Sequence, residues 1–286
     1  MNDILSRRKL KAEIFRIIAT ISTWSSIIIL IILLGNIAWD GLSKVNWTFL
    51  NNFPSRFPHK AGIKAAIWGS IWMLALVAII AVPIGVSAAI YLEEYAKKNK
   101  LSRFIEINIA NLAGVPSIIY GILGLTIFVR FFQLDRSLLA GSLTMSLLIL
   151  PVIIMAAREA IKAVPKSIRL GAFAVGATRW QTIQSHVLPA ATPGIFTGVI
   201  LAMSRAIGET APLIMIGALT YVAFVPENIN DPFTTLPIQI YNWVSRPQVE
   251  FHHLAAAGII VLLVVLLTMN AAAILIRNRS LKKYKW

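Results

Sequence analysis

Long runs of apolar residues, separated by short polar and basic segments, cover almost the whole chain. An apolar stretch of about 18 residues or more with few charges is long enough to cross a bilayer as an α-helix. The first run follows a basic start, yet it is too long for a signal peptide and no small-x-small cleavage site follows it, so we expect an uncleaved span. The pattern predicts an all-α membrane protein with six transmembrane helices, at about residues 17–38, 65–92, 104–132, 138–157, 192–222 and 254–276.

The composition excludes several classes of function. Of the 286 residues, 57% are hydrophobic and 14% are charged, whereas a soluble domain averages about 25% charged residues. The chain has no cysteine, so it holds neither a disulfide nor a thiolate metal site. It has no G-x-x-x-x-G-K-[S/T] sequence, so it does not bind ATP through that phosphate-binding loop. The four histidines show no metal-like spacing with carboxylates, apart from Glu250 near His252 and His253, and we assign no metal site.

The distribution of basic residues predicts the orientation of the spans. Nineteen of the 27 Lys and Arg residues fall in four segments, at residues 1–16, 93–103, 158–191 and 277–286, and seven fall at the opposite ends of the spans. Because basic residues gather in cytoplasmic loops, we expect two cytoplasmic tails, 1–16 and 277–286, around a membrane domain over 17–276. This orientation explains the net charge of +15 without a nucleic-acid partner.

The polar segment over residues 165–189 is too patterned to be an irregular loop. Proline occupies both of its ends and Gly176 breaks its middle, which predicts two short helices at about 166–175 and 178–187. Each helix carries an apolar face at helical spacing: Ile168, Ala172 and Val175 on the first, and Trp180, Ile183 and Val187 on the second. Amphipathic helices with basic residues between two spans indicate a cytoplasmic docking surface for a soluble partner.

Arg205 and Glu209 are charged residues inside the fifth expected span. Residues four apart share a face of a helix, so the two can pair. Charges in hydrocarbon are costly and normally face a bundle interior or a watery path. Pro212 cannot donate a hydrogen bond to the Gly208 carbonyl, which weakens the helix beside the charges. We predict a path for oxyanions, which suit a planar guanidinium; the alternative is a structural pair that only fixes helix packing.

The segment that ends at Pro189 resembles the EAA loop of ABC importer permeases. In that pattern E-A-A is followed by three residues, a glycine, nine residues and I-x-L-P. Ala172 occupies the last position of the triplet, Gly176 the glycine, and Leu188 with Pro189 the end of the motif. Three positions depart from the Glu, Ala and Ile of the pattern: Leu170, Gly171 and His186. The spacing from the glycine to the closing Leu-Pro is intact.

Further matches extend from the second span onward. RAIGETAPL at 205–213 is similar to a motif of the permease subunits of phosphate ABC importers, the PstA type in particular. Three other stretches match the same family: YLEEYA at 91–96, LAGVPSIIYGILGL at 112–125 and LPIQIYNW at 236–243. The resemblance implies a type I ABC importer permease architecture with cytoplasmic coupling helices, in the plasma (inner) membrane.

The resemblance also implies partners and cofactors. The partners would be a homologous PstC-type permease, two copies of a PstB-type ATPase, an external PstS-type phosphate-binding protein and the lipid bilayer. ATP and Mg would be bound by the ATPase, and this chain would bind no cofactor and would not be an enzyme. We therefore expect half of a phosphate translocation pathway, coupled to the ATPase through residues 166–189. The alternatives are a permease for molybdate or sulfate, and a proton-coupled secondary transporter that uses Arg205 and Glu209, although the inverted repeats of many such proteins are not seen.

Roles follow for individual residues from the patterns and the resemblance together. The predicted translocation path contains Arg205, Glu209, Ser204 and Thr210, with a helix break at Gly208 and Pro212. The predicted ATPase-docking surface, within the loop over 158–191, contains Arg169, Ala172, Gly176, Thr178, Arg179, Trp180, Leu188 and Pro189. The external loop over 223–253 offers Glu227, Asp231, Trp243 and Arg246 for contact with a binding protein.

Overall fold

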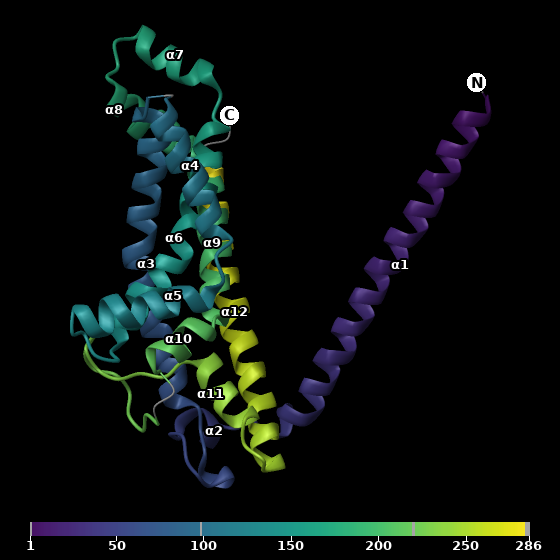
Figure 1. Ribbon diagram of the computed structural model, residues 1–286, viewed down its shortest axis with the longest axis vertical. Coiled ribbons are helices and arrows are strands. Elements are labelled where there is room, and N and C mark those ends of the chain that lie inside the picture. The colour runs from purple at the N-terminus through teal and green to yellow at the C-terminus, as the bar shows by residue number, and fades with distance from the viewer. Residues whose placement is uncertain (1, 98, 219–220, 284–286) are drawn as a thin grey trace.

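The computed structural model describes residues 2–97, 99–218 and 221–283, and it is a bundle of helices (Figure 1). Five helices are long and apolar enough to cross a membrane, and a sixth span results if two helices that meet at a bend count as one. The predicted all-α membrane fold is therefore confirmed. The helices and helical turns are α1 (Asn2–Gly41), η1 (Leu42–Lys44), α2 (Trp47–Asn51), η2 (Pro58–Lys60), α3 (Lys64–Ile90), η3 (Tyr91–Tyr95), α4 (Lys100–Ala113), α5 (Ser117–Gly124), η4 (Leu125–Phe131), α6 (Leu138–Lys162), α7 (Lys166–Ala174), α8 (Arg179–Thr182), η5 (Ile183–Val187), α9 (Leu188–Gly208), α10 (Ala211–Ile216), α11 (Leu236–Val244) and α12 (Val249–Lys283).

The core of the molecule forms where α3, α6 and α9 pack together. Small residues let these helices approach closely. A Cβ on Gly85 of α3 would lie 2.6 Å from the Ile153 side chain on α6, and a Cβ on Gly198 of α9 would lie 2.3 Å from Ala156 on α6. Buried side chains around these contacts include Met73, Val77, Met145, Ile149, Ala202, Ala206 and Leu213.

The first helix, α1, stands apart from this bundle and leans away from α12 (Figure 1). It meets α12 near its last turn, where a Cβ on Gly41 would lie 2.7 Å from the backbone at Ala256 and Ala257. None of the most apolar part of this helix is buried within the chain. Lipid or another subunit must cover this surface in the membrane, because apolar area exposed to water is unfavourable.

The third predicted span, over 104–132, is not a straight helix. α4 ends at Ala113, and the helix formed by α5 and η4 continues at 101° to it. The turn between them contains Gly114 and Pro116, and the Tyr120 hydroxyl donates a hydrogen bond across the bend to the Leu112 carbonyl at 2.8 Å. α5 consequently lies across the bundle rather than along it (Figure 1).

The fifth span also differs from the prediction at both ends. Instead of 192–222, a continuous helical stretch runs from Arg179 to Gly208 through α8, η5 and α9. The predicted helix over 178–187 is therefore the first part of a long helix rather than a separate element. Leu188 and Pro189, expected to close the docking loop, are half-buried within that helix. Pro189 fits there because it lies in the first turn of α9, where a missing N–H costs little after the wider turn of η5.

The two ends of the bundle differ in what they carry. The beginning of α1, the α7–α8 segment and the end of α12 lie at one end of the long axis, whereas α2 and α11 lie at the other (Figure 1). The predicted external loop over 223–253 is partly helical, because it contains α11 and the first turn of α12. Beside it, the backbone N–H of Leu138 donates to the Asp231 carbonyl at 2.9 Å, which ties this segment to the start of α6.

Candidate functional site

The helix that carries Arg205 breaks completely beside the charged pair. α9 ends at Gly208, and Glu209 follows with an extended backbone at φ −74° and ψ 130°. Thr210 then leads into α10, which has Pro212 in its first turn, a position where the missing N–H of proline costs nothing. The sequence predicted a helix break at Gly208 and Pro212, and the structure has two helices here, joined by two non-helical residues.

Arg205 and Glu209 nevertheless contact each other. The Nε of Arg205 donates to Oε1 of Glu209 at 3.2 Å. Glu209 lies just past the end of α9, but its φ of −74° is close to the helical value, so its side chain stays on the face of the helix that carries Arg205. The arginine side chain is 40% exposed and the glutamate side chain is 17% exposed. The cation therefore lies at the surface of this single chain, and the carboxylate that pairs with it is more buried.

Arg205 lies about midway along the bundle. α9 runs antiparallel to α6, with Gly194 opposite Ala160 and Gly198 opposite Ala156. Continuing this register brings Arg205 level with the centre of α6, which has 25 residues. A helix of that length spans about 37 Å, more than the roughly 30 Å hydrocarbon core of a bilayer. A membrane that encloses α6 would therefore hold this charge near its midplane.

The two hydroxyl residues predicted to surround the cation are directed elsewhere. Oγ of Ser204 lies 2.7 Å from the Ile200 carbonyl and 2.7 Å from Oδ1 of Asn270, so this side chain joins α9 to α12. Thr210 lines a mainly apolar cavity of about 450 Å³ between α10, α11 and α12, together with Gly208. The structure thus brings Arg205 and Glu209 together, but it does not gather the hydroxyl groups around them.

 

The helix after the break, α10, packs closely against α5. A Cβ on Gly121 of α5 would lie 2.7 Å from Cα of Pro212 in α10, and 2.8 Å from the Met215 side chain. Two of the stretches singled out in the sequence, 112–125 and 205–213, therefore meet at this point. The transverse helix α5 supports α10 from one side, which fixes the position of the break relative to the bundle.

The α7–α8 segment at the end of the bundle has a well-defined local structure. Gly176 adopts φ +85° between the two helices, a left-handed conformation that glycine adopts without strain. Thr178 caps α8: its Oγ1 accepts from the Gln181 N–H at 3.3 Å, and the Gln181 side chain accepts from the Thr178 N–H at 2.8 Å. Ala172, within α7, is buried. The backbone of this segment is therefore set by its own sequence.

The outer surface of this segment is apolar and basic. Its exposed apolar side chains are Leu170, Phe173, Val175 and Trp180. Val175, expected on the apolar face of the first short helix, follows the end of α7 and is 84% exposed. The guanidinium of Arg179 lies 5.0 Å from the ring centroid of Tyr95 in η3. Exposed apolar side chains with basic neighbours are typical of a surface that another protein covers.

Arg169, which was predicted to belong to the docking surface, faces into the chain instead. Its Nη2 donates to Oε1 of Glu94 at 2.7 Å and its Nε donates to the same oxygen at 3.0 Å. Two other bonds reach the carbonyl oxygens of Val164 at 2.8 Å and Ile161 at 2.9 Å. The side chains of Arg169 and Glu94 are only 17% and 10% exposed. Arg169 is therefore a clamp that joins α7 to η3 and to the end of α6.

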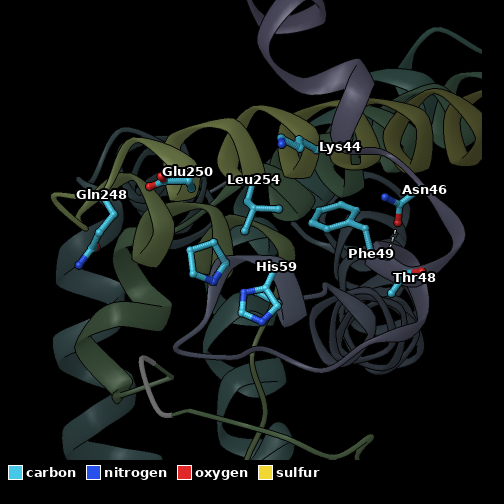
Figure 2. Close-up of a pocket in the computed structure, with 10 residues that line it drawn as sticks. Lys44, Asn46, Thr48, Phe49, His59, Gln248, Glu250 and Leu254 are labelled. Carbon is cyan, nitrogen blue, oxygen red and sulfur yellow. Dashed lines mark hydrogen bonds between the residues drawn. The ribbon is translucent and has the colours of Figure 1, made fainter.

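A cavity of about 720 Å³ opens at the opposite end of the molecule, between α2, η2 and the start of α12 (Figure 2). Phe49 and Leu254 contribute apolar surface to the wall. Lys44 and Glu250 contribute charged groups of opposite sign, and His59 contributes an imidazole. No local pattern predicted this cavity, because its walls come from segments far apart along the chain.

The four residues predicted to contact an external partner have different environments. Trp243 is fully buried in a cluster between α11 and α12, so the prediction for this residue is wrong. Oδ2 of Asp231 accepts from the backbone N–H of Glu227 at 2.8 Å, which makes Asp231 a cap of its own loop. The guanidinium of Arg246 lies 4.3 Å from the ring centroid of Phe251. Glu227 is exposed. No group of histidine and carboxylate side chains suited to a metal ion occurs among the residues the structure describes.

Comparison with known proteins identifies the family. A family model described as the inner membrane component of binding-protein-dependent transport systems matches residues 81–281. The chain belongs to this family. The region matched includes both the α7–α8 segment and the break between α9 and α10.

Relatives and solved structures agree with this assignment. The chain is 30% identical over 267 residues to the probable ABC transporter permease protein YqgI of Bacillus subtilis, covering 89% of this chain and 91% of that protein. It is 33% identical over 198 residues to the phosphate transport system permease protein PstA of Yersinia pestis, covering 69% and 66%. The inward-facing MetNI methionine ABC transporter is similar in fold, with a TM-score of 0.62 at 17% identity over 75% of this chain and 94% of that chain.

Proposed function

We propose that the chain is the PstA-type subunit of an ATP-driven importer of inorganic phosphate, and that it forms half of the translocation pathway. The support for phosphate is the likeness to several PstA proteins at 31–36% identity, over 56–67% of their length. YqgI and YqgH, whose names give no cargo, match as well. The family assignment supports the permease role, and the PstA relatives support phosphate as the cargo.

The proposed site for phosphate in the translocation path rests on the Arg205–Glu209 pair. A charged side chain at the centre of a bilayer costs about 3 kcal/mol or more if it faces lipid. Arg205 is 40% exposed in the single chain, so in the assembly it must face a polar partner or a watery path. A guanidinium binds phosphate oxygens with two parallel hydrogen bonds. Glu209 would hold the cation while the path is empty and would compete with phosphate for it, so that the anion is released.

The α7–α8 segment is proposed as the docking surface for a separate ATPase. Trp180 and its exposed apolar neighbours would enter the partner, since aromatic side chains dominate the energetics of many interfaces. Movement of α7 would reach α3 through the hydrogen bonds from Arg169 to Glu94. At the other end, the cavity lined by Lys44, His59 and Glu250 would meet an external phosphate-binding protein (Figure 2). A homologous permease would complete the path and cover part of α1.

The site is tested by phosphate uptake into vesicles that contain the complete complex. Arg205→Gln and Glu209→Gln should each lower the initial rate by about tenfold or more, because a hydrogen bond to a charged group contributes about 1.5–3 kcal/mol. Arg130→Gln, which removes an exposed charge from η4, should transport at the wild-type rate. Co-purification of the partner subunits shows that each variant assembles. Wild-type rates in both pair variants would leave the pair a purely structural role.

The cargo and the energy source require separate measurements. Uptake of labelled phosphate should resist unlabelled molybdate and sulfate, and it should stop when ATP is withheld. Preferential uptake of another oxyanion would overturn phosphate as cargo while leaving the permease role intact. Phosphate uptake by vesicles that hold this chain alone, driven by a proton gradient, would instead show a secondary transporter.

A further inference from the structure

A basic cavity lies at the end of the molecule that carries α7. It has a volume of about 620 Å³ and is formed by the turn after η3, the start of α4 and the end of α6. Clefts of about 300–1,000 Å³ are typical of sites for small molecules. Five basic side chains line the cavity: Lys97, Lys100, Arg103, Arg158 and Lys162. The translocation pair does not take part in it.

The two carboxylates in the wall of this cavity share one arginine. Nε of Arg158 lies 3.2 Å from Oε2 of Glu93, and another nitrogen of the same guanidinium lies 2.9 Å from Oε1 of Glu106. The Arg158 side chain is only 15% exposed, so this three-residue network is part of the protein structure. Five basic and two acidic side chains leave three excess positive charges. The cavity therefore favours an anion.

Three of the basic side chains are available to a ligand. Within the described ranges of the chain, Lys97, Lys100 and Arg103 have no ion pair and no side-chain hydrogen bond. The amino end of α4 opens into the same cavity, because Asn99 and Ser102 also line it. Helix α4 has 14 residues, and the positive end of its dipole adds to the potential. The arrangement is suited to a phosphate group, which accepts bonds from both lysine and arginine.

The surroundings of the cavity indicate where this phosphate group comes from. The turns of α4 next to the cavity expose Leu101, Phe104 and Ile107, and none of the described side chains of α4 is buried. A ligand with a phosphate group in the cavity and apolar chains along α4 would satisfy both surfaces. We propose that this cavity binds the phosphate group of an anionic phospholipid, with the acyl chains on the exposed face of α4. Basic pockets at the ends of membrane helices bind such headgroups.

Lipid retention by the purified complex tests the proposal. The complex is stripped of lipid in detergent and titrated with phosphatidylglycerol or with phosphatidylcholine of the same chain length, and native mass spectrometry counts the lipids retained. The wild type should prefer phosphatidylglycerol by about tenfold or more, because each basic residue near an anionic headgroup contributes about 1 kcal/mol. The triple variant Lys97→Gln/Lys100→Gln/Arg103→Gln should lose this preference.

A matched control separates the cavity from general attraction to a basic protein. The variant Lys44→Gln/Arg56→Gln/Lys60→Gln removes the same charge from the opposite end of the molecule and should keep the wild-type preference. Equal preference in both triple variants would overturn the cavity as the site. Equal retention of the two lipids by the wild type would overturn the choice of an anionic lipid. Displacement of phosphatidylglycerol by millimolar inorganic phosphate would assign the cavity to the free anion instead of a lipid.

Discussion

Arg205 and Glu209 pair at the end of a helix, where Arg205 lies within α9 and Glu209 follows its last residue. Along the side of a helix, residues four apart are held about 5–6 Å apart at Cβ by the helix itself. Here the distance depends on the φ angle of Glu209, which lies outside α9 and α10. The pair can therefore open without unwinding either helix. A transient binding site in a transport path needs such adjustable geometry.

Gly121 provides a prediction at the same scale. The substitution Gly121→Ala places a methyl group 2.7 Å from Cα of Pro212, and this backbone atom cannot move without shifting α10. Overpacking of this kind costs about 1–3 kcal/mol. We expect a lower melting temperature of the purified complex, and phosphate uptake reduced because the break beside Arg205 is displaced.

Gly114→Ala is the matched control for this substitution. Gly114 lies in the same bent unit, but its Cβ would meet its nearest atom, the Asn111 carbonyl oxygen, at 3.4 Å. Its backbone has φ −92°, which alanine adopts readily. The control should melt and transport like the wild type. An unchanged melting temperature in Gly121→Ala would show that α5 and α10 are not packed as tightly as the structure has them.

At the scale of elements, the ion pair between Arg169 of α7 and Glu94 of η3 holds the α7–α8 segment to the bundle. Removing one partner of a buried ion pair costs about 3–5 kcal/mol, because the other charge is left uncompensated. We expect Glu94→Gln to release α7 and to speed trypsin cleavage after Lys166 and Arg179 by about tenfold or more, through local opening of the segment. The measurement is limited proteolysis of the complex in detergent.

Glu159→Gln gives the control for the clamp. It breaks the Lys162–Glu159 contact of 3.7 Å, whose side chains are 58% and 61% exposed, and exposed pairs contribute about 0–1 kcal/mol. Neither substitution changes a trypsin site. Equal cleavage rates for Glu94→Gln, Glu159→Gln and the wild type would contradict the clamp.

The same elements show what the sequence could and could not predict. Hydropathy located the spans and the positions of Gly176, Gly208 and Pro212 located the turns, because both signals are local. The 101° bend between α4 and α5 was missed, since an apolar pattern records length but not direction. The inward course of Arg169 was missed because its partner, Glu94, is 75 positions away. Contacts of this kind depend on packing, which a single sequence does not record.

At the scale of the whole molecule, the separation of charge and the two ends of the bundle lead to the same orientation. The segments over 1–16, 93–103, 158–191 and 277–286 hold most of the basic residues. The start of α1, the α7–α8 segment and the end of α12 lie together at one end of the long axis (Figure 1). From the positive-inside rule we expect this end to be cytoplasmic. The α7–α8 segment and both termini would then lie on the side of the ATPase, and the cavity in Figure 2 would lie on the external side of the membrane.

Single cysteines test this orientation without interference, because the chain has no cysteine of its own. We expect Lys60→Cys in η2 to react with a membrane-impermeant maleimide in intact cells. Lys11→Cys in α1 and Asn278→Cys in α12 should react only after the membrane is permeabilised. All three residues are exposed in the structure, so a failure to react in intact cells reflects the side of the membrane rather than burial in the chain. Labelling of Lys11→Cys or Asn278→Cys in intact cells would invert the orientation, and the α7–α8 segment would then lie out of reach of a cytoplasmic ATPase.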